Sequence, residues 1–241
     1  MTAAASVDIW FRETASLDEA AIAADVSMLS ADEIAQYRRF HFARDARDYA
    51  AAHALLRTML SRDSERAPGD WQFDKTPAGK PFLRDAGATG GASFSLSHTR
   101  GMVACAVTSD ADVGIDVEGI DRVVHASDIA TRFFAPSETA ALAKLAPEIR
   151  TRRFFDLWTL KEALIKATGL GLALSLDRFV FDVGAFVTGR EIGVCGPPDV
   201  AAQQWQFELF TPGRGFRGAV AIRRRSGSPL RVTIRPSTAQ A

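Results

Sequence analysis

FFDLWTLKEALIKATG, residues 154–169, decides how the chain folds, because it predicts a long helix with one buried apolar stripe. The stripe recurs at helical spacing: Phe154, Leu157, Trp158, Leu164 and Ile165. Gly169 stands where a helix commonly ends in the left-handed conformation. Glu162 and Lys166 are four residues apart and project from the same side. Taken alone, they indicate a surface ion pair worth about 0.2–0.5 kcal/mol, although such a pair beside a buried tryptophan can also serve a metal and a phosphate.

The composition is that of a soluble globular protein. The chain has 241 residues, 47% of them hydrophobic, and a formal net charge of zero, so one or two domains with a real core are expected. Neutral charge argues against non-specific nucleic-acid binding. The N-terminus lacks the features of a secretory signal, and no run approaches the roughly 18 apolar residues of a membrane span, so we expect a cytoplasmic protein that does not contact a membrane. Cys105 and Cys195 lie among apolar residues and are expected to be buried, reduced thiols.

Two acidic residues alternate with apolar ones in the segment Val-Gly-Ile-Asp-Val-Glu, residues 113–118. The period of two in a strand puts Ile115 and Val117 into the core, and Asp116 and Glu118 together on the other face. Carboxylates at that spacing repel each other unless a cation lies between them, and their hard oxygen atoms suit Mg²⁺. The alternative, a half-exposed strand with two solvated acids, stays open on this segment alone.

A loop at residues 75–81 carries Lys75 and Lys80 beside Gly79. A glycine lets backbone N–H groups approach a phosphate and the lysines supply charge, but the full P-loop pattern is missing. Residues 93–97 then alternate as a strand that ends at His98, and the apolar run 102–107 predicts a strand buried on both faces.

The remaining pattern predicts an α+β protein with two similar lobes. Helices are expected as two short capped elements within 17–40, then at about 45–60, and from Pro136 to about 145; His53 is expected at the edge of the core rather than as a ligand. Residues 94–101 and the apolar strand after them are similar to 207–222, so each half would combine a long helix with a small sheet. We expect one lobe at 1–118 and the other at 119–241, with a loose tail from about 226 that holds one β-prone piece at 230–234.

Five motifs in order resemble those of the 4'-phosphopantetheinyl transferases, in particular the larger, two-lobed Sfp-type class. They are Gly79-Lys80-Pro81, Phe94-Ser95-Leu96-Ser97-His98, Gly114-Ile115-Asp116-Val117-Glu118, Arg132-Phe133-Phe134 with Glu138, and Trp158 through Lys161-Glu162 to Lys166. The resemblance implies two pseudo-symmetric lobes, each a long helix packed on a small, mainly antiparallel sheet. It also implies an Mg²⁺-dependent transfer of phosphopantetheine from coenzyme A to a serine of an apo acyl or peptidyl carrier protein, with release of 3',5'-ADP.

The resemblance also implies roles for single residues. Asp116, Glu118 and Glu162 would hold the metal on the pyrophosphate, which Lys166 would contact, and the residues expected to line the nucleotide site are Lys75, Gly79, Lys80, Ser97 and His98. Either Glu162, directly or through water, or Glu138 would take the proton of the serine. Trp158 and Lys161 are expected to be structural. Two departures stand out: Ser95 replaces a common asparagine, and Glu33 and Gln36 occupy positions that often hold a lysine or arginine for the 3'-phosphate.

Two other functions compete with this interpretation. A non-catalytic coenzyme A-binding protein would need no complete set of three acids. A metal-dependent phosphohydrolase usually has more metal ligands, including histidines, and none of the four histidines here neighbours the acids in sequence. We expect a monomer, because the repeat supplies internally what a dimer would otherwise provide. The sequence does not distinguish carriers of fatty-acid, polyketide or non-ribosomal peptide biosynthesis.

Overall fold

The computed structural model of the protein describes residues 6–85, 91–121, 126–171, 174–182, 191–201, 203–225 and 227–237. Its helices are α1 (Glu19–Ser27), α2 (Ala31–Tyr37), α3 (Ala43–Ser61), α4 (Ala126–Phe133), α5 (Pro136–Ala143), α6 (Pro147–Thr168) and α8 (Pro198–Ala201). Its strands are β1 (Ser6–Glu13), β2 (Phe73–Lys75), β3 (Pro81–Leu83), β4 (Ser93–Thr99), β5 (Met102–Thr108), β6 (Ala111–Gly119), β7 (Val180–Phe181), β8 (Val194–Cys195), β9 (Gln204–Phe210), β10 (Phe216–Arg224) and β11 (Arg231–Pro236).

The predicted long helix is confirmed as α6, which begins with Pro147 at its first turn and ends at Gly169. Gly169 adopts φ +71° and its N–H bonds to the carbonyl of Ile165, as a left-handed helix end requires. The predicted capping box of α2 is also present, because Ser30 and Glu33 bond each other's backbone N–H groups. At α1 the cap is Asp18, whose Oδ1 accepts from Ala21 N.

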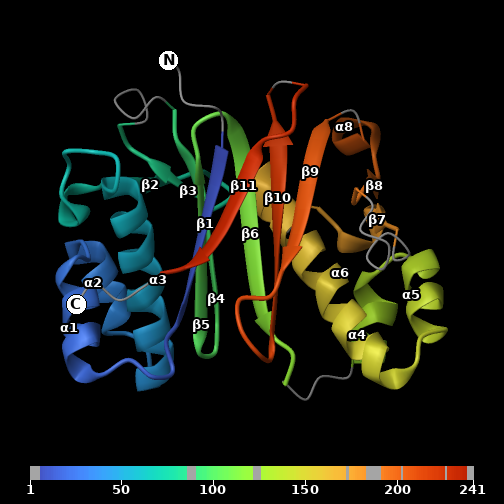
Figure 1. The fold of residues 1–241 in the computed structure, drawn as a ribbon, viewed down its shortest axis with the longest axis horizontal. Helices are drawn as coiled ribbons and strands as arrows, with labels where there is room; N and C mark the ends of the chain where they lie inside the picture. Colours follow the sequence, from blue (N-terminus) through green and yellow to red (C-terminus); the bar gives the residue numbers. More distant parts are fainter. Residues whose placement is uncertain are drawn as a thin grey trace.

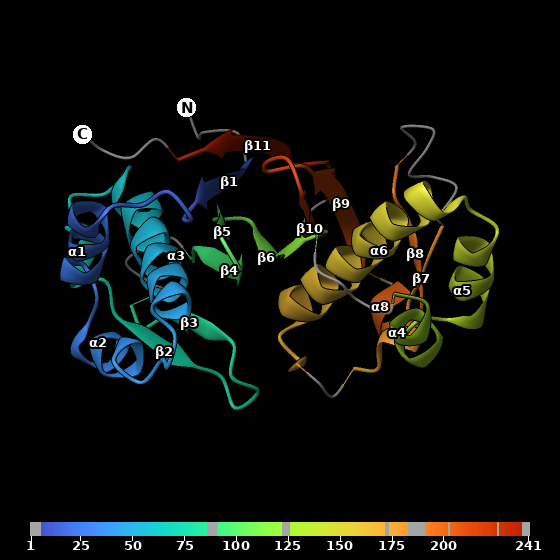
Figure 2. The ribbon, with the colours of Figure 1, turned by 90° about the horizontal axis from the view of Figure 1, so that it is seen from below.

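Two sheets stand side by side at the centre of the molecule, each covered by one long helix (Figure 1). The first has the strand order β11-β1-β5-β4 and lies against α3; the second has the order β6-β10-β9 and lies against α6. Figure 2 shows α3 and α6 flanking the central strands from opposite sides of the molecule. The prediction of an α+β fold with two similar lobes, each a long helix on a mainly antiparallel sheet, is therefore confirmed.

The internal repeat corresponds to two antiparallel hairpins, β4-β5 and β9-β10. A glycine with positive φ lies just before each second strand, Gly101 at +85° and Gly215 at +84°, where a side chain would be strained. The division at residues 118 and 119 stays a prediction. What the structure adds is an exchange of strands: β6 belongs to the second sheet, and β11 pairs in parallel with β1 of the first. The β-prone piece expected at 230–234 in the tail is confirmed as β11, at 231–236.

The core fills three layers. One cluster lies between α3 and the first sheet, a second lies around α6, and a third lies between the two sheets, with side chains of β1, β5, β6 and β10. β5 contributes Val103 and Cys105 to the first cluster and Ala104 to the third, so its predicted burial on both faces is confirmed. Both cysteines are free thiols, but only Cys105 is buried; Cys195 is exposed, because it ends the short strand β8. Among the described residues, no helix has the length and apolar character that crossing a bilayer needs.

Candidate active site

The close contact between α6 and β6 places the candidate site. At Gly114 of β6, an added Cβ would lie 2.0 Å from the carbonyl oxygen of Ala163 and 2.4 Å from the backbone N of Ala167. A glycine is therefore needed here for the helix to reach the strand. The contact lies beside Asp116 on the strand and Lys166 on the helix, so it fixes how these two side chains meet.

Asp116 is buried, and its two carboxylate oxygens have different surroundings. Oδ1 accepts from Lys166 Nζ at 2.8 Å and from the hydroxyl of Ser97 at 2.8 Å. Lys166 Nζ also donates to the carbonyl oxygen of Ile115 at 3.1 Å. Oδ2 is buried and has no hydrogen-bond partner in the described structure. A buried carboxylate oxygen without a partner is costly, and a bound cation would satisfy it.

Glu118 and Glu162 share the electrostatic environment of Asp116. The half-buried Glu118 accepts from the hydroxyl of Thr99 at 3.2 Å. Burial is the main cause that raises the pKa of Glu162; the charge of Asp116 raises it further, Lys166 lowers it, and Glu118 adds a smaller rise. The predicted face of acids on β6 is thus present, and Glu162 of α6 is near enough that the charges of Asp116 and Glu118 act on it.

The three acids are not arranged as a complete metal-binding site. In the ranges that the structure describes, no three His, Cys, Asp or Glu side chains are grouped as a bound metal would group them. Instead, the ammonium group of Lys166 compensates Asp116. The bare Oδ2 of Asp116 and two neighbouring carboxylates are nevertheless the hard oxygen donors that Mg²⁺ takes.

Two serines of β4 join the two sheets at this point, a role that the alternating pattern did not reveal. The hydroxyl of Ser95 accepts from the backbone N–H of Ile115 at 3.1 Å, and that of Ser97 accepts from Val117 at 3.3 Å. Side-chain oxygens thus take the place of backbone partners between β4 and β6. Ser97, predicted to line the nucleotide site, here orients Asp116, and Ser95 is also buried.

His98 lies next to these serines on β4, with an exposed ring. Desolvation by neighbouring atoms is the main cause that lowers the pKa of His98; Asp48 raises it, and the charges of Lys166 and His53 lower it further. The ring therefore lies in a region that α3, β4 and α6 border together. That is compatible with the predicted nucleotide site.

The loop 75–81 lies beside the end of α6. Gly79 adopts φ +86°, which closes a turn between Thr76 and Lys80. Lys80 Nζ donates to the carbonyl oxygens of Ala167 at 3.1 Å and Val113 at 3.4 Å, and desolvation lowers its pKa. A cavity of about 330 Å³ lies between this loop, β4 and the end of α6. Lys75 is exposed at the start of the loop.

Glu138 does not join the acids. Its carboxylate pairs with Lys161 Nζ at 2.8 Å and accepts from the backbone N–H groups of Phe181 and Ala135 at 2.8 and 3.0 Å. Both side chains of the pair are fully enclosed in the core around α6. The structure therefore gives Glu138 a structural role and places it outside the candidate site, because its oxygens are used inside the core. Lys161 is structural, as predicted.

Sequence comparisons agree with this arrangement. The profile of the 4'-phosphopantetheinyl transferase superfamily matches residues 112–221, and that of the 4'-phosphopantetheinyl transferase N-terminal region matches 16–110. The chain belongs to this family. The two matches meet at the turn between β5 and β6, so one covers α3 with the β4-β5 hairpin and the other covers the acids and α6.

Several curated relatives carry the same family name. The chain is 39% identical to 4'-phosphopantetheinyl transferase HetI of Nostoc sp. over 60% of its own length and 61% of the relative's. It is 33% identical to 4'-phosphopantetheinyl transferase Sfp of Bacillus subtilis, over 64% of its own length and 66% of the relative's. Each match thus spans less than two thirds of the relative's length. A solved holo-[acyl-carrier-protein] synthase of Thermotoga maritima aligns with TM-score 0.39 and 24% identity over 48% of this chain and 64% of that one.

Proposed function

We propose that this phosphopantetheinyl transferase moves the 4'-phosphopantetheine group of coenzyme A to a serine of an apo acyl or peptidyl carrier protein. The observation that carries the proposal is the meeting of Asp116, Glu162 and Lys166 across the contact of β6 with α6. Family membership and the names of the relatives support it.

The reaction replaces a phosphoanhydride bond of coenzyme A with a phosphoester bond to serine. The serine oxygen forms a bond to the phosphorus that bears the pantetheine, the bond to the other phosphate of the diphosphate breaks, and 3',5'-ADP leaves with the electron pair. The serine proton goes to a base, for which we propose Glu162. Glu162 would act directly or through a water molecule that it orients, because a carboxylate that binds the metal is a weak base on its own. We propose Glu162 over Glu138 for this role, because the oxygens of Glu138 are used in its enclosed pairing with Lys161.

Asp116, Glu118 and Glu162 would hold Mg²⁺, which supplies positive charge for the phosphoryl oxygens when bound. Contact with the diphosphate and the positioning of Asp116 are roles for other side chains of the protein. Lys166, the cation already beside Asp116, would turn to the diphosphate, and Ser97 would keep Asp116 in place. Lys75, Gly79 and His98 are proposed to line the nucleotide. Lys80 would support them from its backbone contacts.

The partners and the setting remain proposals of the same kind: coenzyme A and a carrier protein, no nucleic acid, action as a monomer, and a cytoplasmic location. The carrier could belong to fatty-acid, polyketide or non-ribosomal peptide biosynthesis. A panel of apo carriers from these three pathways would identify the preferred one.

Mass spectrometry tests the proposed activity directly. An apo carrier incubated with the protein, coenzyme A and Mg²⁺ should gain the mass of one phosphopantetheine, and a carrier with its serine changed to alanine should gain nothing. Chelation of the metal should stop the reaction. Release of 3',5'-ADP without a carrier would instead support a phosphohydrolase, and binding of coenzyme A without either product would support a non-catalytic binding protein.

A further inference from the structure

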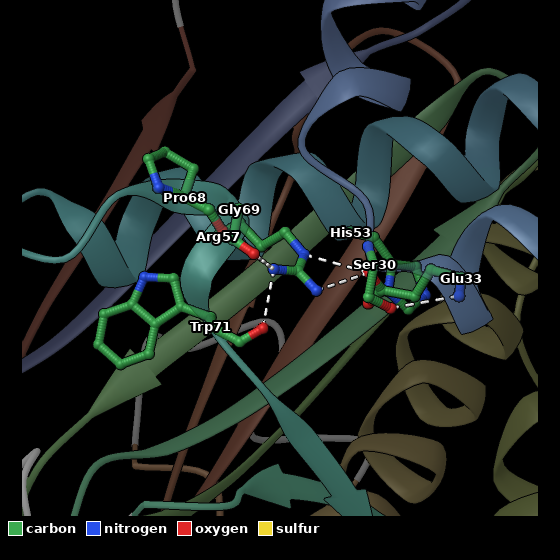
Figure 3. Close-up of polar contacts among 7 residues, drawn as sticks. All are labelled: Ser30, Glu33, His53, Arg57, Pro68, Gly69 and Trp71. Carbon is green, nitrogen blue, oxygen red and sulfur yellow. Dashed lines mark hydrogen bonds and ion pairs between the residues drawn. The ribbon is translucent and has the colours of Figure 1, made fainter.

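A buried polar network connects α2 with α3 (Figure 3). Arg57 of α3 has no exposed side-chain surface; its Nη2 and Nε donate to Glu33 Oε2 at 2.6 and 3.2 Å, and its Nη1 donates to the carbonyl oxygens of Pro68 and Trp71, both at 2.9 Å. Burial alone would raise the pKa of Glu33, but hydrogen bonds from His53 and Ser30 and the charges of His53 and Arg57 lower it to about 2. Glu33 is therefore an ionised carboxylate with a fixed position.

Glu33 fixes the ring of His53. Nδ1 of His53 lies 2.7 Å from Glu33 Oε1, and an ionised carboxylate only accepts, so Nδ1 carries a proton. The ring also packs against Tyr49, with centroids 4.2 Å apart. Nε2 has no hydrogen-bond partner among the described residues, and the side chain keeps 21% of its surface exposed. A histidine held through Nδ1 with Nε2 open is oriented as it would be to meet a ligand.

His53 borders the same region as two residues of the candidate site. It comes from α3, His98 from β4 and Lys166 from α6. His98 projects from the same face of β4 as Phe94 and Leu96, which pack in the apolar cluster with α3. The charges of His53 and Lys166 both act on His98. α3 and α6 are the two helices that flank the central strands in Figure 2. The region is therefore bordered by nitrogen-bearing side chains from both lobes, and Lys166 is the one that pairs with Asp116.

We propose that His53 is a second histidine of the coenzyme A site, positioned by Glu33 so that its Nε2 donates to the 3'-phosphate together with His98. This inference rests on the proposed function. Coenzyme A carries two separate phosphate groups, a diphosphate and a 3'-monoester. Asp116, Glu162 and Lys166 suit the diphosphate, which leaves the monoester for the α3 side. A phosphate dianion prefers charged N–H donors, and such bonds are about twice as strong as neutral ones.

Two substitutions test the roles of the two ring nitrogens of His53 one at a time. In His53→Asn the side-chain amide nitrogen replaces Nδ1 and can still bond Glu33, but nothing replaces Nε2. In His53→Gln the amide nitrogen replaces Nε2 without its charge. Titration calorimetry should show that the Asn variant binds 3',5'-ADP about tenfold more weakly, the Gln variant less so, while both bind 5'-ADP as the wild type does. The KM for coenzyme A should rise similarly, with kcat little changed, and that for dephospho-coenzyme A should not.

The exposed His41, from the segment before α3, provides a matched control, because His41→Ala removes a neighbouring imidazole that lies outside the network. A measurement on the wild type needs no variant: the ¹⁵N shift of His53 Nε2 should change on adding 3',5'-ADP but not 5'-ADP. The role of His53 would be overturned if its variants lost equal affinity for both nucleotides, if they lost none, or if the ¹⁵N shift did not change. Carrier labelling by the wild type would in that case still support the transferase activity. If the wild type neither binds 3',5'-ADP nor labels a carrier, the proposed function fails with it.

Discussion

At the scale of single residues, Asp116 shows how a side chain can be positioned for the cation that we propose. Two donors, Lys166 and Ser97, meet at one carboxylate oxygen and leave the other buried and bare. The side chain is therefore held in one orientation before any ligand arrives. Desolvating Oδ2 without a partner costs folding free energy, and binding of a cation would recover it.

Asp116→Asn should lower carrier labelling at saturating Mg²⁺ by a factor on the order of 10²–10³, because it removes charge where the phosphoryl oxygens need compensation. The fold should survive, since an amide can still accept from Lys166 and Ser97. Glu162→Gln should act similarly and Glu118→Gln more weakly, because Mg²⁺ accepts water in place of one carboxylate. Comparing labelling rates with thermal denaturation separates the two effects. Near-normal turnover in the Asp116 variant would contradict the metal assignment.

Glu33 makes the folded state sensitive to acid. Its folded pKa of about 2 lies below the ordinary value of 4.5, so its contribution to the free energy of unfolding is complete above about pH 4.5 and is lost as the pH falls towards 2. Glu33→Gln, which leaves Arg57 with a neutral partner, should be less stable than the wild type at pH 7. Urea denaturation at pH 7, 4 and 3 should show the difference between the two proteins shrinking as the pH falls. A constant difference would mean that Glu33 does not titrate in this way.

At the scale of elements, the contact between α6 and β6 decides whether the site exists. Gly114→Ala would place a methyl group within 2.0 Å of the backbone of α6, so the helix must move away from the strand. We expect a cost of about 1–3 kcal/mol in unfolding free energy and a further loss of labelling, because Lys166 would separate from Asp116.

Gly119 of the same strand provides the control, because its added Cβ would meet only the ring of Phe216, at 3.8 Å. Gly119→Ala should therefore change both quantities much less. The labelling rate of each variant, measured at a temperature where both are folded, tests the argument. Equal losses in the two variants would show that a glycine-to-alanine change anywhere in β6 has the same effect, and that the close helix contact is not the cause.

The same element shows what the sequence could predict. The alternation of 113–118 predicted which side chains of β6 face the core, and Ile115 and Val117 are buried there as expected. The helical spacing and Gly169 predicted α6. Local pattern could not predict that Ser95 and Ser97 would bond the backbone of β6, because a hydroxyl on a half-buried strand has many possible partners. Nor could it show that Glu138 pairs with Lys161, 23 positions along the chain, within the core.

At the scale of the whole molecule, the two lobes hold each other together. The apolar cluster between the sheets takes side chains from β1 and β5 of the first and from β6 and β10 of the second, so neither sheet buries its inner face alone. β11 returns from the second lobe to pair with β1. A boundary drawn on the sequence misses this exchange, because strand partners far apart in the chain leave no local signal.

The last strand should therefore stabilise both lobes. β11 covers β1, and Arg235 and Arg62 both pair with Asp8 and both stack on the ring of Trp10, at 5.2 and 5.8 Å. Removing residues 227–241 would expose the backbone edge of β1. It would also remove Leu230 from the apolar cluster between the two sheets. We expect a single unfolding transition at markedly lower urea concentration.

Two spectroscopic probes can follow the unfolding of the two lobes separately. One reports on Trp71 beside α3 and the other on Trp205 in β9. In both the full chain and the truncated one, the two signals should change at the same urea concentration, because the shared cluster couples the sheets. Arg235→Ala is the control: it removes one guanidinium from Asp8 and Trp10 but keeps β11 paired, so its effect should be smaller. Separate transitions in the truncated chain, with Trp205 unaffected, would show that the lobes fold independently and that β11 serves the first lobe alone.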